Sequence, residues 1–392
     1  MPPASADLES DILLRLRELP EIFEAIRLSS PAELAGQKHL RERFDEELVR
    51  AALSIHEARQ KAIGKLPDAE LLWLTRVGLE QSTSWSVARH KARRFRGNPV
   101  VIDLCCGIGV DASNIATEAH VLAVDSSHAM CIRSGWNAEI WGRGDQVETM
   151  CGDAGASDWA GQMVHVDPDR RAESDRPTKR LELYQPNLEW MQKLSRTAAG
   201  GAIKIGPASN FLQKFPGCEI ELISLDGECR EATVWFGSLG GLHSFRATVL
   251  PSGESISADP LSAWTNTTEQ LGRYLFDPDP AIVRSGLLDV MAEHHQLLRL
   301  DADEEYLTAD TLPETSFVTA FEVEVVLPNN IKDLKKYLRN RGSRNYEIKC
   351  RRIPTQADAV RRQLPVGDEI ARVIFFARLK QRSVIVVARR IG

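Results

Sequence analysis

Three acidic residues and a glycine-containing turn stand out as groups that could hold a nucleotide-like ligand. The turn Asp103-Leu104-Cys105-Cys106-Gly107-Ile108-Gly109 follows a short apolar run and precedes a predicted helix. Glycines there let the backbone approach a ligand closely, and the start of the helix offers unpaired N–H groups. Asp125 ends the next predicted strand, where a carboxylate can accept hydrogen bonds from both hydroxyls of a ribose. Asp153 follows the strand after that and suits an adenine amino group.

Two classes of cofactor compete for this turn. An NAD-type site uses the same strand, turn and helix and the same ribose acid. The turn lacks the G-x-G-x-x-G spacing, however, and Asp103 inside it would repel a pyrophosphate. A cofactor with a positive charge and no phosphate fits better, and S-adenosylmethionine is such a cofactor. Taken alone, Gly107-x-Gly109 also fits a tight strand–helix connection with no ligand.

A second group of residues could orient the acceptor of a transferred group. Asp167-Pro168-Asp169-Arg170 follows another predicted strand. The Asp167 carboxylate and the Pro168 carbonyl can accept hydrogen bonds from an exocyclic –NH₂ and turn its lone pair towards an electrophilic methyl group. Arg170 can stack on a base or pair with a phosphate. The structural alternative for Asp167-Pro168 is an Asx turn at a strand end.

Other residues near these positions have less decided roles. No Pro-Cys nucleophile for attack on a base carbon is present at the acceptor segment. Lys204 ends a predicted strand and can either approach a substrate phosphate or pair with a strand-end acid. Aromatic candidates for stacking are Trp85, Tyr184 and Trp190, although a place in the core is the favoured interpretation of each.

The framework expected around these residues is an α/β fold. Short apolar runs that end near the acids predict strands, and the segments between them predict helices. Such alternation is typical of a parallel sheet with helices on both faces. The predicted strands cover residues 100–104, 121–125, 147–150, 163–166, 202–205 and 232–236, and the predicted helices cover 111–117 and 130–140.

Two further regions flank this alternation. From residue 8 to about residue 80, leucine and isoleucine recur at helical spacing, which predicts helices. A stretch rich in Pro and Asp over 251–328 is interpreted as a connection. The remaining residues predict a small α/β domain, with helices over 331–340 and 358–363 and strands over 346–350, 371–377 and 383–388.

The net charge of −6 would argue against a nucleic-acid partner, but it is an average over an uneven chain. Residues 329–392 hold 17 basic and five acidic residues, net +12, so the first 328 residues carry −18. This asymmetry favours a polyanion-binding end, although a solvated charged face is the alternative. Lys332, Lys336 and Arg339 share one face of a predicted helix. Further candidates for phosphate contacts are Arg341, Arg344, Arg351 and Arg352.

Cysteine and histidine spacing argues against a metal centre. The seven Cys form no C-x-x-C pair and the nine His form no H-x-x-H pattern, so neither a zinc site nor a disulfide framework is expected. No apolar run approaches the roughly 20 residues of a membrane span, and acids stand where a signal peptide has bases. We therefore expect a cytoplasmic protein with no metal and no membrane partner.

With these motifs the sequence resembles class I S-adenosylmethionine-dependent methyltransferases, and more narrowly a bacterial group with a C-terminal THUMP-like domain. The matching segments are the turn, Asp125, Asp153, 79–83, 164–171, 202–207, 271–280 and 346–352. The resemblance implies a Rossmann-like seven-stranded methyltransferase sheet. It also implies four parts: an N-terminal helical region (1–78), the methyltransferase domain (79–250), a connecting region (251–328) and a basic THUMP-like domain (329–392).

The resemblance assigns roles to individual residues. Asp103, Gly107 and Gly109 would surround the methionine part of the cofactor, Asp125 the ribose and Asp153 the adenine, while Gln81 and Thr83 would help to close the pocket. Cys105 stands where the common form of the turn has Gly. At the acceptor segment, Asp169 and Arg170 replace a proline and an aromatic residue of amino-group methyltransferases.

Three functions fit the sequence. The first is methylation of an exocyclic amine or ring nitrogen of a base in structured RNA such as tRNA or rRNA, with S-adenosylmethionine as cofactor. The second is noncatalytic RNA binding on a methyltransferase scaffold, suggested by the altered acceptor segment. The third is methylation of a small molecule or a protein, with the basic domain serving assembly.

Overall fold

The protein folds as two compact units. In the computed structural model, residues 4–29, 34–171, 177–367 and 370–391 are described. The first unit comprises Met1–Glu219 and Ala232–Gly241, and the second comprises Ile220–Glu231 and Leu242–Gly392. Within the described residues no helix is long and apolar enough to cross a membrane.

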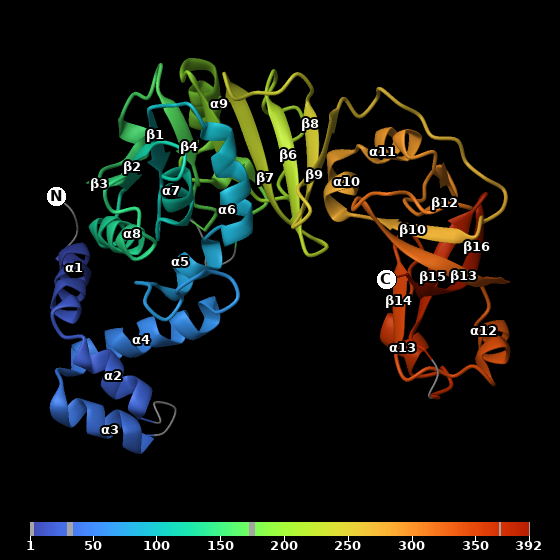
Figure 1. The fold of residues 1–392 in the computed structure, drawn as a ribbon, viewed down its shortest axis with the longest axis horizontal. Helices are drawn as coiled ribbons and strands as arrows, with labels where there is room; N and C mark the ends of the chain where they lie inside the picture. The colour runs from blue at the N-terminus through green and yellow to red at the C-terminus, as the bar shows by residue number, and fades with distance from the viewer. Residues whose placement is uncertain (1–3, 30–33, 172–176, 368–369, 392) are drawn as a thin grey trace. The chain divides into compact units, whose positions relative to one another are not determined.

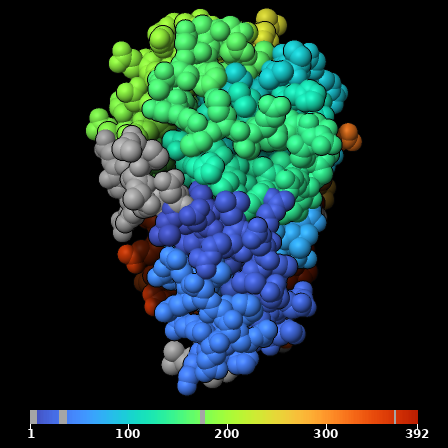
Figure 2. Space-filling model, turned by 90° about the vertical axis from the view of Figure 1, so that its left-hand side faces the viewer, coloured from blue at the N-terminus to red at the C-terminus, as the bar shows by residue number. Residues whose placement is uncertain are grey.

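The first unit begins with helices, as the leucine and isoleucine spacing predicts. They pack through side chains with almost no exposure, including Leu16, Ile22 and Val49. Ion pairs Arg17–Glu139 (2.6 Å) and Glu9–Arg133 (2.7 Å) connect the first helix to residues 133–139. Figure 2 shows the N-terminal helices in blue beside the green part of the chain. The helices are α1 (Ala4–Arg17), α2 (Glu21–Leu28), α3 (Leu34–Arg43), α4 (Glu46–Ala62), α5 (Arg76–Gln81) and α6 (Trp85–Ala92).

An α/β sheet follows these helices (Figure 1). Strands β1 (Val100–Leu104), β2 (His120–Asp125), β3 (Val147–Cys151), β4 (Met163–Val166) and β5 (Gly200–Ile205) are parallel, and β7 (Glu228–Gly237) runs antiparallel to β5. Helices α7 (Val110–Ile115) and α8 (His128–Ile140) connect the first three strands, and α9 (Leu188–Thr197) precedes β5. The predicted α/β fold is therefore present.

The strand number differs from the expected seven. The sheet has nine strands in the order β3-β2-β1-β4-β5-β7-β6-β8-β9. The additional strands not predicted from the sequence are β6 (Glu219–Leu225), β8 (Phe245–Leu250) and β9 (Glu254–Ala258). In β6 the apolar pattern is interrupted by two glutamates, Glu219 and Glu221, both of which are buried.

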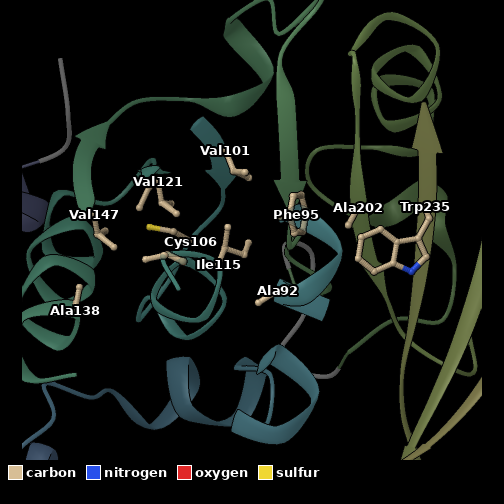
Figure 3. Close-up of a cluster of buried hydrophobic side chains, with 13 residues drawn as sticks. Ala92, Phe95, Val101, Cys106, Ile115, Val121, Ala138, Val147, Ala202 and Trp235 are labelled. Carbon is tan, nitrogen blue, oxygen red and sulfur yellow. The ribbon is translucent and has the colours of Figure 1, made fainter. Parts of the chain in front are cut away.

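The core of the first unit lies against β1, β2 and β7. Phe95, Val101 and Trp235 each have no exposed surface, and the tilted rings of Phe95 and Trp235 pack with centroids 5.8 Å apart (Figure 3). Burial of an aromatic side chain of this size contributes on the order of 2–3 kcal/mol. The core therefore fixes β1, whose carboxyl end begins the nucleotide-type turn.

Buried Asn137 of α8 fixes the position of that turn. Its side chain accepts a hydrogen bond from the Trp73 N–H (2.7 Å) and donates to the Trp73 carbonyl (3.2 Å) and the Ile108 carbonyl (2.9 Å). Because a buried amide is costly unless it is satisfied, these three bonds favour one arrangement of the helix, the turn and the preceding loop.

The second unit contains a separate seven-stranded sheet in the order β11-β12-β10-β13-β16-β15-β14. The stretch expected as a connection instead contributes four of these strands, β10 to β13. The last of them, β13, pairs along most of its length with β16. The elements are β10 (Tyr274–Pro278), α10 (Pro280–Ser285), α11 (Leu288–His294), β11 (Leu298–Arg299), β12 (Leu307–Ala309), β13 (Val318–Pro328), α12 (Ile331–Leu338), β14 (Tyr346–Cys350), α13 (Ala357–Arg361), β15 (Arg372–Leu379) and β16 (Arg382–Arg390).

Candidate active site

A cavity of about 790 Å³ opens at the carboxyl ends of β1, β2 and β4. This volume is within the range of about 300–1,000 Å³ that is usual for small-molecule sites, and the carboxyl ends of parallel strands are where such sites form. Ten of the eleven residues predicted for the cofactor and the acceptor line it, namely Gln81, Thr83, Asp103, Cys105, Gly107, Asp125, Asp153, Asp167, Pro168 and Arg170.

Gly109 is the predicted residue that does not line the cavity. It has φ +82° at the start of α7, and a Cβ there would lie 2.5 Å from Ser134 Oγ and 2.9 Å from Ser134 Cα. Its lack of a side chain therefore lets α7 begin against α8. The structure gives Gly109 a packing role, and its predicted contact with the cofactor stays a prediction.

Gly107 and Cys105 shape the turn itself. Gly107 has φ +55°, and a Cβ added there would project into open space, consistent with a backbone that a ligand can approach. Cys105 has φ +59°, in the left-handed region that favours glycine. A non-glycine residue in this conformation costs about 1–2 kcal/mol. Burial raises the pKa of the Cys105 thiol well above its usual range, and nearby carboxylates add to the shift.

Substitutions of Cys105 test this backbone strain. Cys105→Gly is expected to raise the free energy of unfolding by up to about 1 kcal/mol, because relief of the strain exceeds the extra chain entropy of glycine. Cys105→Val should lower it by more than about 1 kcal/mol, since a β-branched residue is a poor fit at positive φ. Denaturant unfolding measures both, with Cys151→Val on exposed β3 as a near-neutral control. Equal effects of Gly and Val would contradict this interpretation.

Asp125 has two carboxylate oxygens that are each only partly used. Oδ2 accepts the Gly107 N–H and Oδ1 accepts the Ser127 N–H, both at 2.9 Å. Burial raises the pKa of Asp125, and the two N–H donors oppose the shift. Because each oxygen has two lone pairs, both can still accept a ribose hydroxyl. Asp153 lies at the exposed edge of the cavity, where its Oδ1 accepts the Gly155 N–H at 2.8 Å.

Asp103 lines the cavity with a carboxyl group that is almost fully buried. The residue is only 1% exposed, and its Oδ1 is 2.6 Å from His165 Nδ1. Within the described residues its Oδ2 has no hydrogen-bond partner. Burial raises the pKa of Asp103, while His165 opposes the shift. A donor on a ligand would satisfy a buried oxygen of this kind, and the α-ammonium group of S-adenosylmethionine has the complementary charge.

Gln81 and Thr83 line the cavity, and each donates a hydrogen bond to an aspartate that also lines it. The Gln81 Nε2 donates to Asp169 Oδ1 at 2.8 Å, and the buried Thr83 hydroxyl donates to Asp111 Oδ2 at 2.6 Å. Both residues therefore order carboxylates of the site, and each also borders the cavity.

Asp167 is fixed at the acceptor end by an ion pair that the sequence left open. Lys204 Nζ of β5 lies 2.6 Å from Asp167 Oδ2 and 2.9 Å from the Gln81 carbonyl, so it pairs with a strand-end acid. Asp167 Oδ1 has no such partner among the described residues. Pro168 is buried beside it, and its neighbour Asp169 exchanges two backbone hydrogen bonds with Gln185.

Arg170 and the aromatic candidates complete the acceptor end. The Arg170 guanidinium lies near Gly206, where an added Cβ would be 3.1 Å from Nη1. Tyr184 is 1% exposed and its hydroxyl bonds Ser209 at 2.6 Å, so it belongs to the core. Trp85 stacks on Trp141 in another buried cluster. Trp190 lines the cavity and is the aromatic side chain available there for a base.

The basic C-terminal region is largely neutralised by acids from the preceding stretch. Residues 242–392 hold 21 basic and 20 acidic residues, because 242–328 is itself acidic. Arg351 pairs with Asp277 at 2.7 Å, and Arg352 pairs with Glu305. These two arginines therefore have structural partners that explain their presence without RNA. The charge asymmetry along the sequence does not persist in the folded unit.

A cationic surface lies on and just after α12. Lys332, Lys336 and Arg339 are exposed and have no acidic partner among the described residues. The helix buries Leu334 and Leu338 on its opposite face. Beyond it, Arg341 lies over the Tyr337 ring at 4.8 Å, and Arg344 is exposed. No cluster of three or more His, Cys, Asp or Glu in the described residues is arranged to hold a metal ion.

Comparison with known proteins agrees with this geometry. The THUMP domain-like family matches residues 318–390. Uncharacterised S-adenosylmethionine-dependent methyltransferases from two strains of Mycobacterium tuberculosis, CDC 1551 and H37Rv, are 32% identical over 325 residues, which cover 78% of this chain and 86% of theirs. A solved structure from Porphyromonas gingivalis W83, assigned as a methyltransferase, has the same fold, with a TM-score of 0.72 and 18% identity over 89% of this chain and 92% of that one.

These matches confirm the predicted enzyme class and cofactor. The chain belongs to the S-adenosylmethionine-dependent methyltransferases and carries a THUMP-like domain at its C-terminal end.

Proposed function

We propose that this methyltransferase modifies an exocyclic amine or ring nitrogen of a base in structured RNA, such as tRNA or rRNA. The observation that carries the proposal is the Asp167 carboxylate, which Lys204 holds in the same cavity as the predicted cofactor acids and Trp190 of α9. A carboxylate in that cavity can orient an amino group towards a bound cofactor.

In this mechanism the cofactor supplies an electrophilic methyl group on a sulfonium. Asp167 Oδ1 and the Pro168 carbonyl accept hydrogen bonds from the acceptor nitrogen and direct its lone pair along the line of displacement. Asp103, Asp125 and Asp153 would hold the cofactor, which would donate its methyl group to that nitrogen with the sulfur as leaving group. The nitrogen then loses a proton to Asp167 or to water. Lys204 holds the Asp167 carboxylate in position through an ion pair of 2.6 Å.

RNA as the substrate class is supported by the C-terminal domain. The THUMP-like match covers α12, and resemblance to THUMP-like domains implies RNA binding. The unpaired cations of α12 can contact phosphates, and Arg170 at the cavity can stack on a base. Docking by α12 and chemistry at Asp167 are then separate functions of one chain.

Neutralising α12 tests the docking role. The variant Lys332→Gln/Lys336→Gln/Arg339→Gln is expected to raise the KM for RNA at least about tenfold at low salt with kcat unchanged. The slope of log affinity against log salt should fall by about 2–3, since three phosphate contacts are lost. Filter binding and initial-rate assays measure these quantities.

The matched control removes the same charge from the same domain. Arg378, Lys380 and Arg390 each pair with an acid, so their replacement by Gln should change the affinity for RNA less than about twofold. An equal effect of the two triple variants would mean that total charge, and not α12, governs RNA binding.

A second candidate substrate class is a small-molecule or protein amine. The cavity is lined by seven acids, and among the described lining residues Arg170 is the one cationic side chain. Such a lining attracts a cationic amine and disfavours a phosphate deep in the site. Under this alternative the full chain would bind RNA weakly with a shallow salt dependence, and methyl label would enter RNA-free fractions.

A further inference from the structure

A row of buried polar side chains begins and ends at the wall of the cavity and passes behind it through Lys91 and His165, which do not line the cavity. Its members come from α6, β4, α7, β1 and the loop before α6, and each is less than 9% exposed. The contacts run from Thr83 to Asp111 (2.6 Å), Asp111 to Lys91 (2.9 Å), Lys91 to His165 (3.3 Å) and His165 to Asp103 (2.6 Å).

The contacts determine where the proton of His165 lies. The Lys91 ammonium has donors and no acceptor, so His165 Nε2 must accept from it. The proton of the neutral imidazole is then on Nδ1, from which it donates to Asp103 Oδ1. His165 has no exposed surface and meets Phe95 edge-on at 6.4 Å, so water does not supply an alternative partner.

The row is one positive charge short. It contains two carboxylates, Asp103 and Asp111, and one ammonium, Lys91, while the contacts of His165 place one imidazole proton, on Nδ1. Burial opposes ionisation of Asp111, but Lys91 lowers its pKa below the usual range, so that pair is balanced. The neighbouring Lys204–Asp167 pair is also balanced. The unmatched negative charge is on Asp103, which lines the cavity and whose buried Oδ2 has no hydrogen-bond partner among the described residues.

We propose that Lys91 and His165 are positioning residues for the amino-acid end of the cofactor. Lys91 fixes the imidazole tautomer, and the imidazole turns the Asp103 carboxylate so that Oδ2 faces the α-ammonium group. Recognition of that group is thus set by residues behind the cavity as well as by the turn that lines it. The inference uses the shown cofactor class and does not depend on RNA being the substrate.

Two ligands separate this positioning role from a purely structural one. S-adenosylhomocysteine carries the α-ammonium group, whereas 5′-methylthioadenosine has the same adenosine and lacks the amino-acid part. His165→Leu is expected to weaken S-adenosylhomocysteine about 30-fold and 5′-methylthioadenosine less than about threefold in calorimetric titrations of the full chain. His165→Asn places an amide donor near the position of Nδ1 and should recover S-adenosylhomocysteine affinity to within about fivefold.

Lys91 is tested together with its partner. Lys91→Met alone leaves Asp111 charged and buried, so the variant Lys91→Met/Asp111→Asn removes both charges at once. This double variant should bind S-adenosylhomocysteine about tenfold more weakly, and its affinity for 5′-methylthioadenosine should be nearly unchanged. In ¹⁵N spectra of the imidazole, His165 should be the Nδ1–H tautomer in the wild type and a mixture in the double variant.

The proposal is overturned if the variants weaken both ligands equally, or if His165→Leu binds S-adenosylhomocysteine as tightly as the wild type. Should His165→Leu fail to fold, the wild-type spectrum still decides, because an Nε2–H tautomer or an imidazolium contradicts the proposed orientation. Failure here would leave the assignment of Asp167 and of RNA intact, since neither enters the binding measurements.

Discussion

Methyl transfer is expected to fall about 100- to 1,000-fold in Asp167→Asn, with affinity for S-adenosylhomocysteine within about threefold of wild type. The loss follows because an amide orients the acceptor nitrogen less strongly and cannot take its proton. Asparagine is preferable to alanine, since its Oδ1 can still accept from Lys204, which lies 2.6 Å from Asp167 Oδ2. A lysine left unpaired at this buried position would destabilise the fold by about 3–5 kcal/mol.

Initial rates with labelled cofactor and calorimetry with S-adenosylhomocysteine measure the two quantities separately. Asp158→Asn makes the same chemical change on an exposed loop of the same domain and should leave both unchanged. If Asp167→Asn retains wild-type transfer, Asp167 does not orient the acceptor. If it loses cofactor affinity in parallel, the residue belongs to the cofactor site.

Asp125→Ala is expected to weaken S-adenosylhomocysteine about 100-fold, which corresponds to about 2.7 kcal/mol. The change removes both acceptors for the ribose hydroxyls, each a charge-assisted hydrogen bond of about 1.5–3 kcal/mol. It also deprives the Gly107 and Ser127 N–H groups of their partners, so a stability loss of about 1–2 kcal/mol accompanies it. Asp125→Asn keeps one acceptor oxygen, so its affinity for S-adenosylhomocysteine should fall only about tenfold.

Free adenine is the control ligand for this prediction, because it lacks the ribose. Its affinity, measured by the same titration, should be nearly equal in wild type and Asp125→Ala. Equal losses for adenine and S-adenosylhomocysteine would show that Asp125 acts by shaping the turn through Gly107 rather than by holding the ribose.

The sequence predicts the site's acids well because each one ends a short apolar strand. Strands β1 and β4 begin and end at the residues predicted, and Asp103, Asp125 and Asp167 all reach one cavity. Parallel strands bring their carboxyl ends to one edge of a sheet, so chain order alone indicates proximity.

The missed strands share an interrupted apolar pattern. Glu219 and Glu221 are buried in β6, where Glu219 pairs with Arg94 and Glu221 accepts from Thr248 at 2.5 Å. A glutamate in an apolar run predicts a solvent-exposed segment unless a buried partner is known. The partner of Glu219 is Arg94, which is distant in sequence and so could not be recognised. The Pro- and Asp-rich composition of 251–328 similarly obscured β10 to β13.

The charge asymmetry along the sequence is a poor guide to the charge of the folded second unit. The acids that neutralise Arg351 and Arg352 are Asp277 and Glu305, which precede the basic segment 329–392 in the sequence. Lys91 and His165 were missed because 74 residues separate them and no spacing rule links them. One signal was present: His165 interrupts the apolar strand Val164-His165-Val166, and a polar residue there needs a buried partner.

The most direct test of the central claim is the fate of a labelled methyl group. Purified full-length protein would be incubated with methyl-labelled S-adenosylmethionine and total RNA from a strain lacking the gene, and the modified nucleoside would then be mapped. Label on a base nitrogen of tRNA or rRNA, lost in Asp167→Asn and reduced in the α12 triple variant, is the predicted result. Absence of label from all RNA, with label instead in a protein or small-molecule fraction, would contradict it.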